Sequence, residues 1–163
     1  YAANISEDDV SDPYSCEYVK ELSDIAAGEN AGVIVVCSKL EEDISNMDEE
    51  ESREFLSELG IEESGLTQLI KASYSLLGLI SFLTAGPKEV RAWTITKGTK
   101  APGAAGKIHT DFERGFIRAE VISPSDFIAL GGEVAVKEAG KMRLVGRDYI
   151  MQPGDICHFL FNT

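Results

Sequence analysis

The pattern of apolar and polar positions in residues 1–40 predicts a strand, a helix and a second strand. A short apolar run at 1–3 ends in a polar turn. Apolar side chains recur every three or four positions across 14–27, which predicts a helix with one buried face that ends at Gly28. The unbroken apolar run 33–37 predicts a strand buried on both faces, as in a parallel sheet. Together these elements predict one βαβ unit.

The following residues predict two helical regions, of which the first is strongly acidic. In the segment 41–60, the acidic run 48–51 is most simply a solvated helix start, because carboxylates are favoured at the amino end of a helix. A metal-binding cluster is the sharper alternative for this run. The segment 63–86 predicts a second helix, with Ser64 as its N-cap and an apolar face that continues to Ile80.

A change of hydrophobic period follows Gly86-Pro87 and predicts a domain boundary, with one domain at 1–83 and another at 84–163. Alternating positions in 88–95 and 115–122 predict two strands, and the residues from Ser123 to Leu130 predict a short helix. Residues 148–161 predict two short strands separated by a turn at 153–155. The second domain is therefore expected to be α+β, with a small sheet curled over a helix.

Charge separates the two predicted domains. The whole chain carries a net charge of −13, but residues 1–83 hold 19 acidic against 4 basic side chains and residues 84–163 hold 9 against 11. The acidic first domain repels phosphate, so only the second is a candidate for nucleic-acid binding. No apolar run approaches the roughly 20 residues of a membrane helix, so no membrane association is expected.

The three cysteines, Cys16, Cys37 and Cys157, are far apart and form no CxxC pair. This spacing predicts neither a disulfide framework nor a zinc site, and a reducing cytosol fits it best. Gly106-Lys107 and Gly140-Lys141 lack the remaining residues of a Walker A loop. The two histidines stand 49 positions apart, with no nucleophile motif. We therefore expect no catalytic residue and no metal ligand within this chain.

Polar residues follow both predicted parallel strands, at Asn4 and at Ser38-Lys39. Open α/β sheets bind ligands at the carboxyl ends of such strands, although turn residues end every strand, so spacing alone leaves both explanations open. The chain also begins inside a strand pattern with no start signal before it. This start predicts a carboxy-terminal fragment of a protein whose nucleotide site lies mostly upstream.

A basic stretch with interleaved aromatic side chains occupies turn-like sequence in the second domain. Its members are Lys97, Lys100, Lys107, His109, Arg114 and Arg118, with Phe112 and Phe116 between them. Cations meet phosphate and rings stack on exposed bases, so this composition suits RNA. The phenylalanines can equally belong to a core, and the histidine can be an ordinary loop residue.

Long stretches of this sequence resemble one known family. "FLTAGPKEVRAWTITKGTKAPGAAGKIHTDFERGFIRAEVIS" and "KEAGKMRLVGRDYIMQPGDICHFLFN" are similar to the carboxy-terminal TGS domain of the YchF family, the Obg-like ATPases also called EngD. The acidic helix "DEEESREFLSELGIEESGL" resembles the same family. The resemblance implies an incomplete P-loop G domain of parallel strands and helices, then a TGS domain with the ubiquitin-like β-grasp fold.

The resemblance also implies a nucleotide-binding role for the polar residues after the two strands. Asn4-Ile5-Ser6-Glu7 matches the family's N-x-x-E motif, which replaces the guanine-binding Asn-Lys-x-Asp of ordinary GTPases. Asn4 and the backbone of Ile5 would touch adenine, and Cys37-Ser38-Lys39 would form the second base-contacting loop. The family implies hydrolysis of ATP, and less readily GTP, with Mg²⁺. Its P-loop and Mg²⁺ ligands lie upstream of Tyr1, so this fragment is expected to be inactive.

TGS domains also occur in RNA-binding and ribosome-associated enzymes, so the resemblance implies contact with the ribosome or RNA through the basic stretch, in the cytoplasm. A monomer is favoured. Two alternatives stay open, in which the TGS domain is a protein-interaction module or a regulatory lid on its own G domain.

Overall fold

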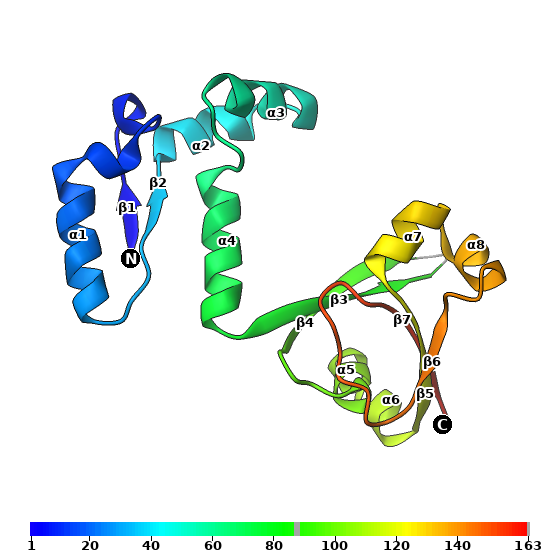
Figure 1. Ribbon diagram of the computed structural model, residues 1–163. Helices are drawn as coiled ribbons and strands as arrows, with labels where there is room; N and C mark the ends of the chain where they lie inside the picture. The colour runs from blue at the N-terminus through cyan, green and yellow to red at the C-terminus, as the bar shows by residue number, and fades with distance from the viewer. Residues whose placement is uncertain (87–88, 163) are drawn as a thin grey trace. The chain divides into compact units, whose positions relative to one another are not determined.

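The computed structural model describes residues 1–86 and 89–162, which form two compact units, Tyr1–Ser75 and Leu76–Thr163 (Figure 1). This division lies upstream of the boundary expected between 83 and 84. The physical reason is β3 (Leu79–Ala85), because this strand pairs with two strands of the second unit. Pro87, part of the expected chain break, lies outside the described residues.

The first unit contains the predicted βαβ arrangement. Strands β1 (Ala2–Asn4) and β2 (Ile34–Val36) pair in parallel, and α1 (Glu17–Gly28) connects them. Two short 3-10 turns, η1 (Glu7–Asp9) and η2 (Pro13–Ser15), lie between β1 and α1. The helix is confirmed, but its expected buried face of Tyr18, Leu22, Ile25 and Ala26 is largely wrong. Val19 and Ala26 are buried, whereas Tyr18 is 80% and Ile25 50% exposed.

The acidic region forms α2 (Ser38–Ser45) and α3 (Glu49–Glu58). Asp48 caps α3, because its Oδ1 accepts hydrogen bonds from the backbone N–H groups of Glu50 and Glu51, both at 2.9 Å. The Glu51 carboxylate accepts in return from the Asp48 N–H at 3.1 Å, which completes a capping box. The prediction of a solvated helix start is confirmed. Across residues 1–86 and 89–162 no group of three His, Cys, Asp or Glu side chains could hold a metal ion.

Helix α4 (Gly65–Leu76) is shorter than the sequence pattern suggests. Its expected continuation to Ile80 is wrong, because Gly78 adopts a φ of 62° and β3 begins one residue later. The apolar residues beyond this glycine alternate between the two faces of the strand, with Ile80 and Phe82 buried. The sequence did not indicate this change from a helical to a strand period, because apolar residues continue on both sides of Gly78.

The second unit is built on a five-stranded sheet with the order β4-β3-β7-β5-β6. Strands β3 and β7 are parallel and all other neighbours are antiparallel. The bounds of the remaining strands are β4 (Val90–Thr96), β5 (Phe116–Ile122), β6 (Arg143–Val145) and β7 (Ile156–Phe161). Of the two final strands expected from the sequence, only β7 forms fully, and Ile150 makes an isolated bridge to Lys100.

Four helices complete this unit among the described residues: α5 (Ala101–Ile108), α6 (Thr110–Arg114), α7 (Pro124–Leu130) and α8 (Glu133–Glu138). Figure 1 shows α5 and α6 within the curl of the sheet. The core joins Ala101, Ala104 and Ala105 of α5 to Phe82 and Phe116 of the sheet. The sheet therefore packs on a helix, as expected. No helix in the described part of the chain is long and apolar enough to cross a membrane.

Candidate functional site

The two polar loops that follow β1 and β2 meet through one side chain. Asn4 Oδ1 accepts a hydrogen bond from the Ser38 backbone N–H at 3.0 Å and another from the Ser38 hydroxyl at 2.8 Å. Parallel pairing brings the ends of the two strands together, with Asn4 opposite Val36 in the register. The first turn of α2 thus takes its cap from a residue 34 positions away.

Ile5 and Cys37 use their backbones to fix these loops. The Ile5 N–H donates to Val36 O at 2.9 Å, so this donor is occupied within the sheet. Cys37 is 5% exposed and precedes the first residue of α2. Because so little of Cys37 is accessible, we assign no base contact to its thiol.

Glu7 and Lys39 place opposite charges near the same edge. Lys39 Nζ pairs with Asp43 Oδ1 at 3.2 Å, one turn along α2. The hydrogen bond and charge of Asp43, with a smaller contribution from Glu7, raise the pKa of Lys39. Glu7 lies in η1 and is exposed. The six residues expected at the base edge therefore lie at or just after the ends of β1 and β2, in two adjoining segments, 4–7 and 37–39.

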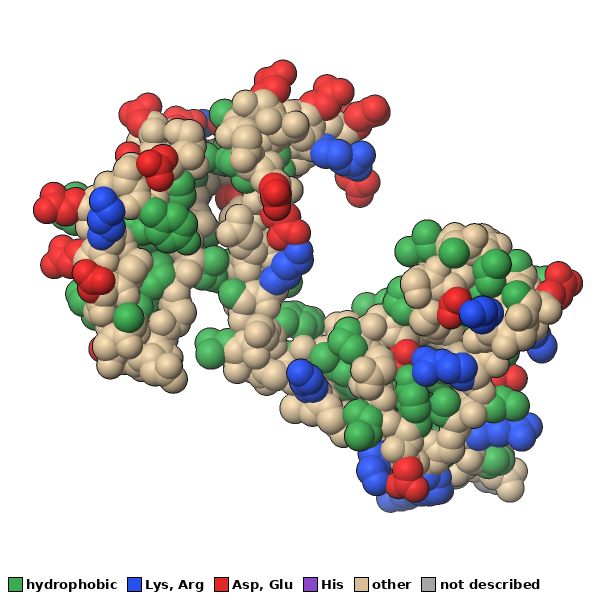
Figure 2. Space-filling view, in the orientation of Figure 1, with side chains coloured by type: hydrophobic (Ala, Val, Ile, Leu, Met, Phe, Trp, Pro, Cys, Tyr) green, Lys and Arg blue, Asp and Glu red, His purple; other side chains and the backbone are tan. Residues whose placement is uncertain are grey.

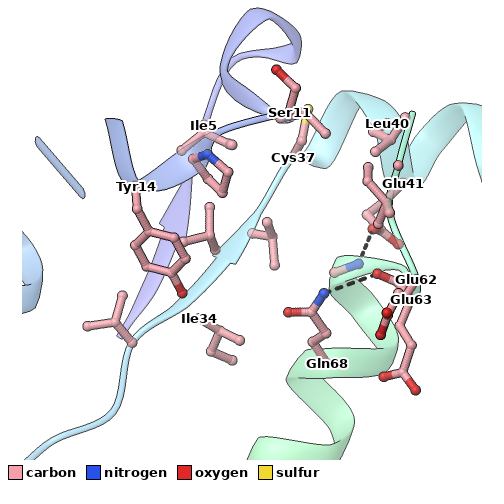
Figure 3. A pocket seen from close by; sticks show the side chains of 18 residues that line it. Ile5, Ser11, Tyr14, Ile34, Cys37, Leu40, Glu41, Glu62, Glu63 and Gln68 are labelled. Atoms are coloured by element: carbon pink, nitrogen blue, oxygen red, sulfur yellow. Dashed lines mark hydrogen bonds between the residues drawn. The ribbon is translucent and has the colours of Figure 1, made fainter. Parts of the chain in front are cut away.

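The hollow drawn in Figure 3 lies on the face of β2 rather than over the strand ends. It has a volume of about 360 Å³, an apolar floor that includes Ile34 and Leu40, and a rim with Tyr14 and Gln68. Of the expected base-edge residues, only Ile5 and Cys37 line it. Glu41 Oε1 accepts from the Gly65 N–H at 2.7 Å and so fixes the start of α4 beside the hollow.

Half of the expected RNA-contact residues lie in helices or a strand, whereas Lys97, Lys100 and His109 lie between such elements. The interpretation of the whole stretch as turn-like is wrong in part, because α5 and α6 form within it. Lys107 lies in the last turn of α5, Arg114 ends α6, and both are exposed. Lys97 lies in the turn after β4, where its N–H donates to Gly78 O at 2.7 Å. Figure 2 shows Lys and Arg side chains gathered over the α5 and α6 end of this unit.

Two members of the basic set, Lys100 and His109, have other local roles. Lys100 Nζ donates to Asp148 Oδ1 at 2.7 Å, and this hydrogen bond lowers the pKa of Asp148. His109 caps α6, because its Nδ1 accepts from the Asp111 N–H at 3.2 Å. Arg118 is exposed on β5, in a strand position opposite Leu160.

Sequence reasoning missed Asp148 as the partner that offsets the Lys100 charge. The two residues are 48 positions apart, so no local pattern links them. The sequence also left open whether Phe112 and Phe116 stack on RNA bases or belong to a core. Phe116 is buried in the core, and Phe112 stacks on Phe161 with ring centroids 3.9 Å apart. Both rings therefore pack inside the second unit, which favours the core explanation over stacking on bases.

Comparisons with known proteins give a consistent result. A family model named YchF-GTPase_C, described as a protein of unknown function (DUF933), matches residues 79–162. Two proteins named ribosome-binding ATPase YchF align over all 163 residues, one from Bacillus subtilis (strain 168) at 60% identity and one from Escherichia coli O157:H7 at 54%. The chain spans 44% of the length of each of these curated relatives.

Two solved structures share the fold. The YchF GTPase of Schizosaccharomyces pombe superposes with a TM-score of 0.83 at 37% identity, over 98% of this chain and 42% of that one. A GTP binding protein from Pyrococcus horikoshii OT3 superposes with a TM-score of 0.64 at 21% identity, over 99% of this chain and 45% of that one. The second likeness bears on the fold alone.

Proposed function

The chain belongs to the YchF family, and on that premise we propose that it forms part of a cytoplasmic protein that hydrolyses ATP, and GTP less readily, and associates with the ribosome or RNA. Residues 1–83 would supply the adenine-binding edge of a G-type nucleotide domain. Residues 84–163 would form a TGS domain of the β-grasp type. Family membership is the broad support for this proposal, and the geometry of the described residues refines it.

The observation that carries the nucleotide proposal is the double hydrogen bond between Asn4 and Ser38. It joins the N-x-x-E loop to the Cys37-Ser38-Lys39 loop at the carboxyl ends of two parallel strands, where α/β sheets bind ligands. Asn4 and Ser38 are both exposed at this edge. Asn4 would contact the base, and Ser38 and Lys39 would border it.

The base preference follows from what the N-x-x-E loop lacks. A guanine-specific Asp accepts hydrogen bonds from the N1–H and 2-amino groups of guanine, whereas adenine has no 2-amino group and carries an acceptor at N1. Glu7 and Ile5 occupy the positions of the Asp and Lys of the guanine motif. This loop therefore lacks the aspartate that binds guanine N1–H and the 2-amino group, which supports a preference for ATP.

Mg²⁺ would shield the phosphate charges of the nucleotide in the whole protein. Within 1–86 and 89–162, no cluster of three His, Cys, Asp or Glu side chains could hold a metal ion. The metal ligands do not fit among these residues, so no metal step is assigned to them. The proposed contribution of this chain to the nucleotide site is confined to the base.

For the second unit, two observations support a TGS domain that binds RNA. The strand order β4-β3-β7-β5-β6, with a parallel central pair and a helix after the first hairpin, fits a β-grasp sheet. Lys107 and Arg114 extend from adjoining helices at one end of this unit and make no ion pair within the described residues. They would contact phosphate, with Lys97, Lys100, His109 and Arg118 as further members of the surface.

One observation favours a different role for the same unit, as a protein-interaction module or a lid on the nucleotide domain. Lys100, in the middle of the basic stretch, is already paired with Asp148. Its charge is therefore partly offset before any phosphate arrives. In this alternative the second unit binds a protein surface or its own nucleotide domain instead of RNA.

Ribosome co-sedimentation of the whole protein that carries this chain tests the proposal. Replacement of Lys100, Lys107 and Arg114 together by Glu should abolish co-sedimentation, because it reverses three charges at the proposed surface. Binding of the unchanged protein should fall steeply with salt, with a slope that grows with each phosphate contact. Unchanged binding of the triple variant, or binding that salt does not weaken, would favour the protein-interaction alternative.

A further inference from the structure

The hydrogen bonds of Ser38 determine which atoms the strand ends offer to a ligand. A backbone N–H can only donate, so the Asn4 atom that it meets at 3.0 Å must be the carbonyl oxygen Oδ1. The Ser38 hydroxyl donates its single hydrogen to the same oxygen at 2.8 Å. Both lone pairs of Asn4 Oδ1 are then occupied, and the hydroxyl hydrogen of Ser38 is committed.

What remains on these two side chains is one donor group and one acceptor. Asn4 Nδ2 points away from the Oδ1 contact and has no hydrogen-bond partner among the described residues. While its hydrogen lies on Asn4 Oδ1, Ser38 Oγ offers its lone pairs to a ligand as an acceptor. Both side chains are exposed, while buried Cys37 and Leu40 on either side of Ser38 and Lys39 anchor the start of α2. A donor and an acceptor thus lie next to each other on a fixed support.

This pair matches one edge of adenine. Adenine presents an acceptor at N7 beside a donor at its 6-amino group, whereas guanine presents acceptors at both N7 and O6. An asparagine can read the adenine edge alone, through its own Nδ2 and Oδ1. Here Oδ1 is already occupied, so a second residue must supply the acceptor, and Ser38 Oγ is the acceptor bonded to that oxygen.

We propose that Ser38 Oγ accepts a hydrogen bond from the 6-amino group of adenine while Asn4 Nδ2 donates to N7, which makes Ser38 the residue that distinguishes adenine from guanine at position 6. This inference rests on the proposed nucleotide site and deepens it. Guanine O6 would bring its lone pairs against those of Ser38 Oγ unless the hydroxyl gave up its hydrogen bond to Asn4 Oδ1, and that loss would weaken guanine binding. The Ser38 side chain would therefore select the base, while the Ser38 backbone N–H would keep Asn4 in place even without the hydroxyl.

Purine riboside triphosphate, which lacks the 6-amino group, tests this contact without any mutation. The whole protein should bind it about tenfold more weakly than ATP, as expected for the loss of one hydrogen bond. Ser38→Ala should weaken ATP binding by a similar factor, leave the binding of purine riboside triphosphate unchanged, and improve GTP binding. Ser45→Ala is the matched control, because Ser45 is an exposed serine on the same helix that bonds only Glu42 O.

Three outcomes would overturn the proposal. If Ser38→Ala weakens ATP and purine riboside triphosphate equally, Ser38 only positions Asn4. If it changes neither affinity while Asn4→Asp weakens ATP binding, the nucleotide site stands and the role of Ser38 in base selection fails. If the unchanged protein binds none of the three nucleotides, the proposed nucleotide site fails as well. A thermal unfolding midpoint for each variant shows whether its binding loss comes from unfolding.

Discussion

Gly115 and Asn162 approach each other so closely that no side chain fits between them. The Asn162 N–H donates to Gly115 O at 2.8 Å, and a Cβ built on Gly115 would lie 1.9 Å from Asn162 O. Gly115 is the C-cap of α6 and leads into β5, while Asn162 follows β7. This contact closes the corner of the second unit next to Arg114, one of the proposed RNA-contact residues.

Replacement of Gly115 by Ala should therefore destabilise the second unit. The new methyl group meets backbone, which can move only by breaking the pairing between β5 and β7, so we expect a loss of about 3 kcal/mol in the free energy of unfolding. Urea denaturation measures this change. Gly146→Ala is the control, because nothing lies within 4 Å of its built Cβ. Equal stability of the two variants would show that the corner adapts.

Asp155 is the buried carboxylate of the second unit, with 2% of its surface exposed. Its Oδ2 accepts from the Tyr149 hydroxyl at 2.8 Å and from the Gln152 N–H at 2.9 Å. Its Oδ1 lies 3.4 Å from an Arg143 nitrogen. Because every neighbour is a donor, the side chain must offer two acceptors at this position.

Asp155→Asn should lower the free energy of unfolding by about 1–3 kcal/mol, because an amide turns a donor toward a donor. Asp148→Asn is the matched control, since the Asp148 carboxylate is 94% exposed and an exposed ion pair contributes about 0–1 kcal/mol. Both changes are measured by urea denaturation. A variant of Asp155 as stable as the Asp148 control would contradict the role given to this network.

The stability of the fold should fall at alkaline pH because of Cys157. Burial, and then the charge of Asp155, raise the pKa of the Cys157 thiol well above its ordinary value. An unfolded thiol ionises near pH ~8.5 while the folded one stays protonated, so the unfolded state binds fewer protons above that pH. Stability is therefore fully present below about pH 8.5 and is lost as pH rises.

Comparison with Cys157→Ala isolates this effect, because other alkaline ionisations are common to both proteins. Between pH 9 and 10 the unchanged protein should lose about 1.4 kcal/mol more per pH unit than the variant. Chemical denaturation across this range gives the two slopes. Parallel slopes would mean that the thiol ionises equally well in the folded and unfolded states.

Local patterns predicted the first unit well. The βαβ prediction was confirmed because an apolar run at 33–37 and a helical period at 14–27 are strong signals over short distances. The acidic helix start at 48–51 was an equally local signal, although its capping box at Asp48 was not predicted. The same reasoning failed at Gly78, because leucine and isoleucine on either side of this glycine suit both a helix and a strand.

Helix α5 was missed for a different reason. Its sequence APGAAGKI contains glycine and proline, which usually indicate turns. The signal that could have found it is the spacing of Ala101, Ala104 and Ala105, which are all fully buried. Their small side chains let this helix lie close to the sheet, so the helix is stabilised by packing rather than by an evident amphipathic pattern.

The sequence predicted where the candidate site lies, but not the atoms that form it. The loops at 4–7 and 37–39 were expected to lie together because parallel strands end at one edge, and they do. Their base-binding role stays a prediction. The identity of the atom that joins them, Asn4 Oδ1, could not be read from the sequence, because it depends on backbone geometry at the start of α2.

The most direct test of the nucleotide site is the ATP affinity of the whole protein with Asn4→Asp, measured by titration calorimetry. This variant keeps an oxygen for the two Ser38 donors and replaces only the free amide donor. We predict an ATP affinity at least about tenfold lower, an unchanged thermal unfolding midpoint without nucleotide, and normal ATP binding by the charge control Asn46→Asp. An unchanged affinity of the Asn4→Asp variant would contradict the account, because Asn4 Nδ2 would then have no part in binding the base.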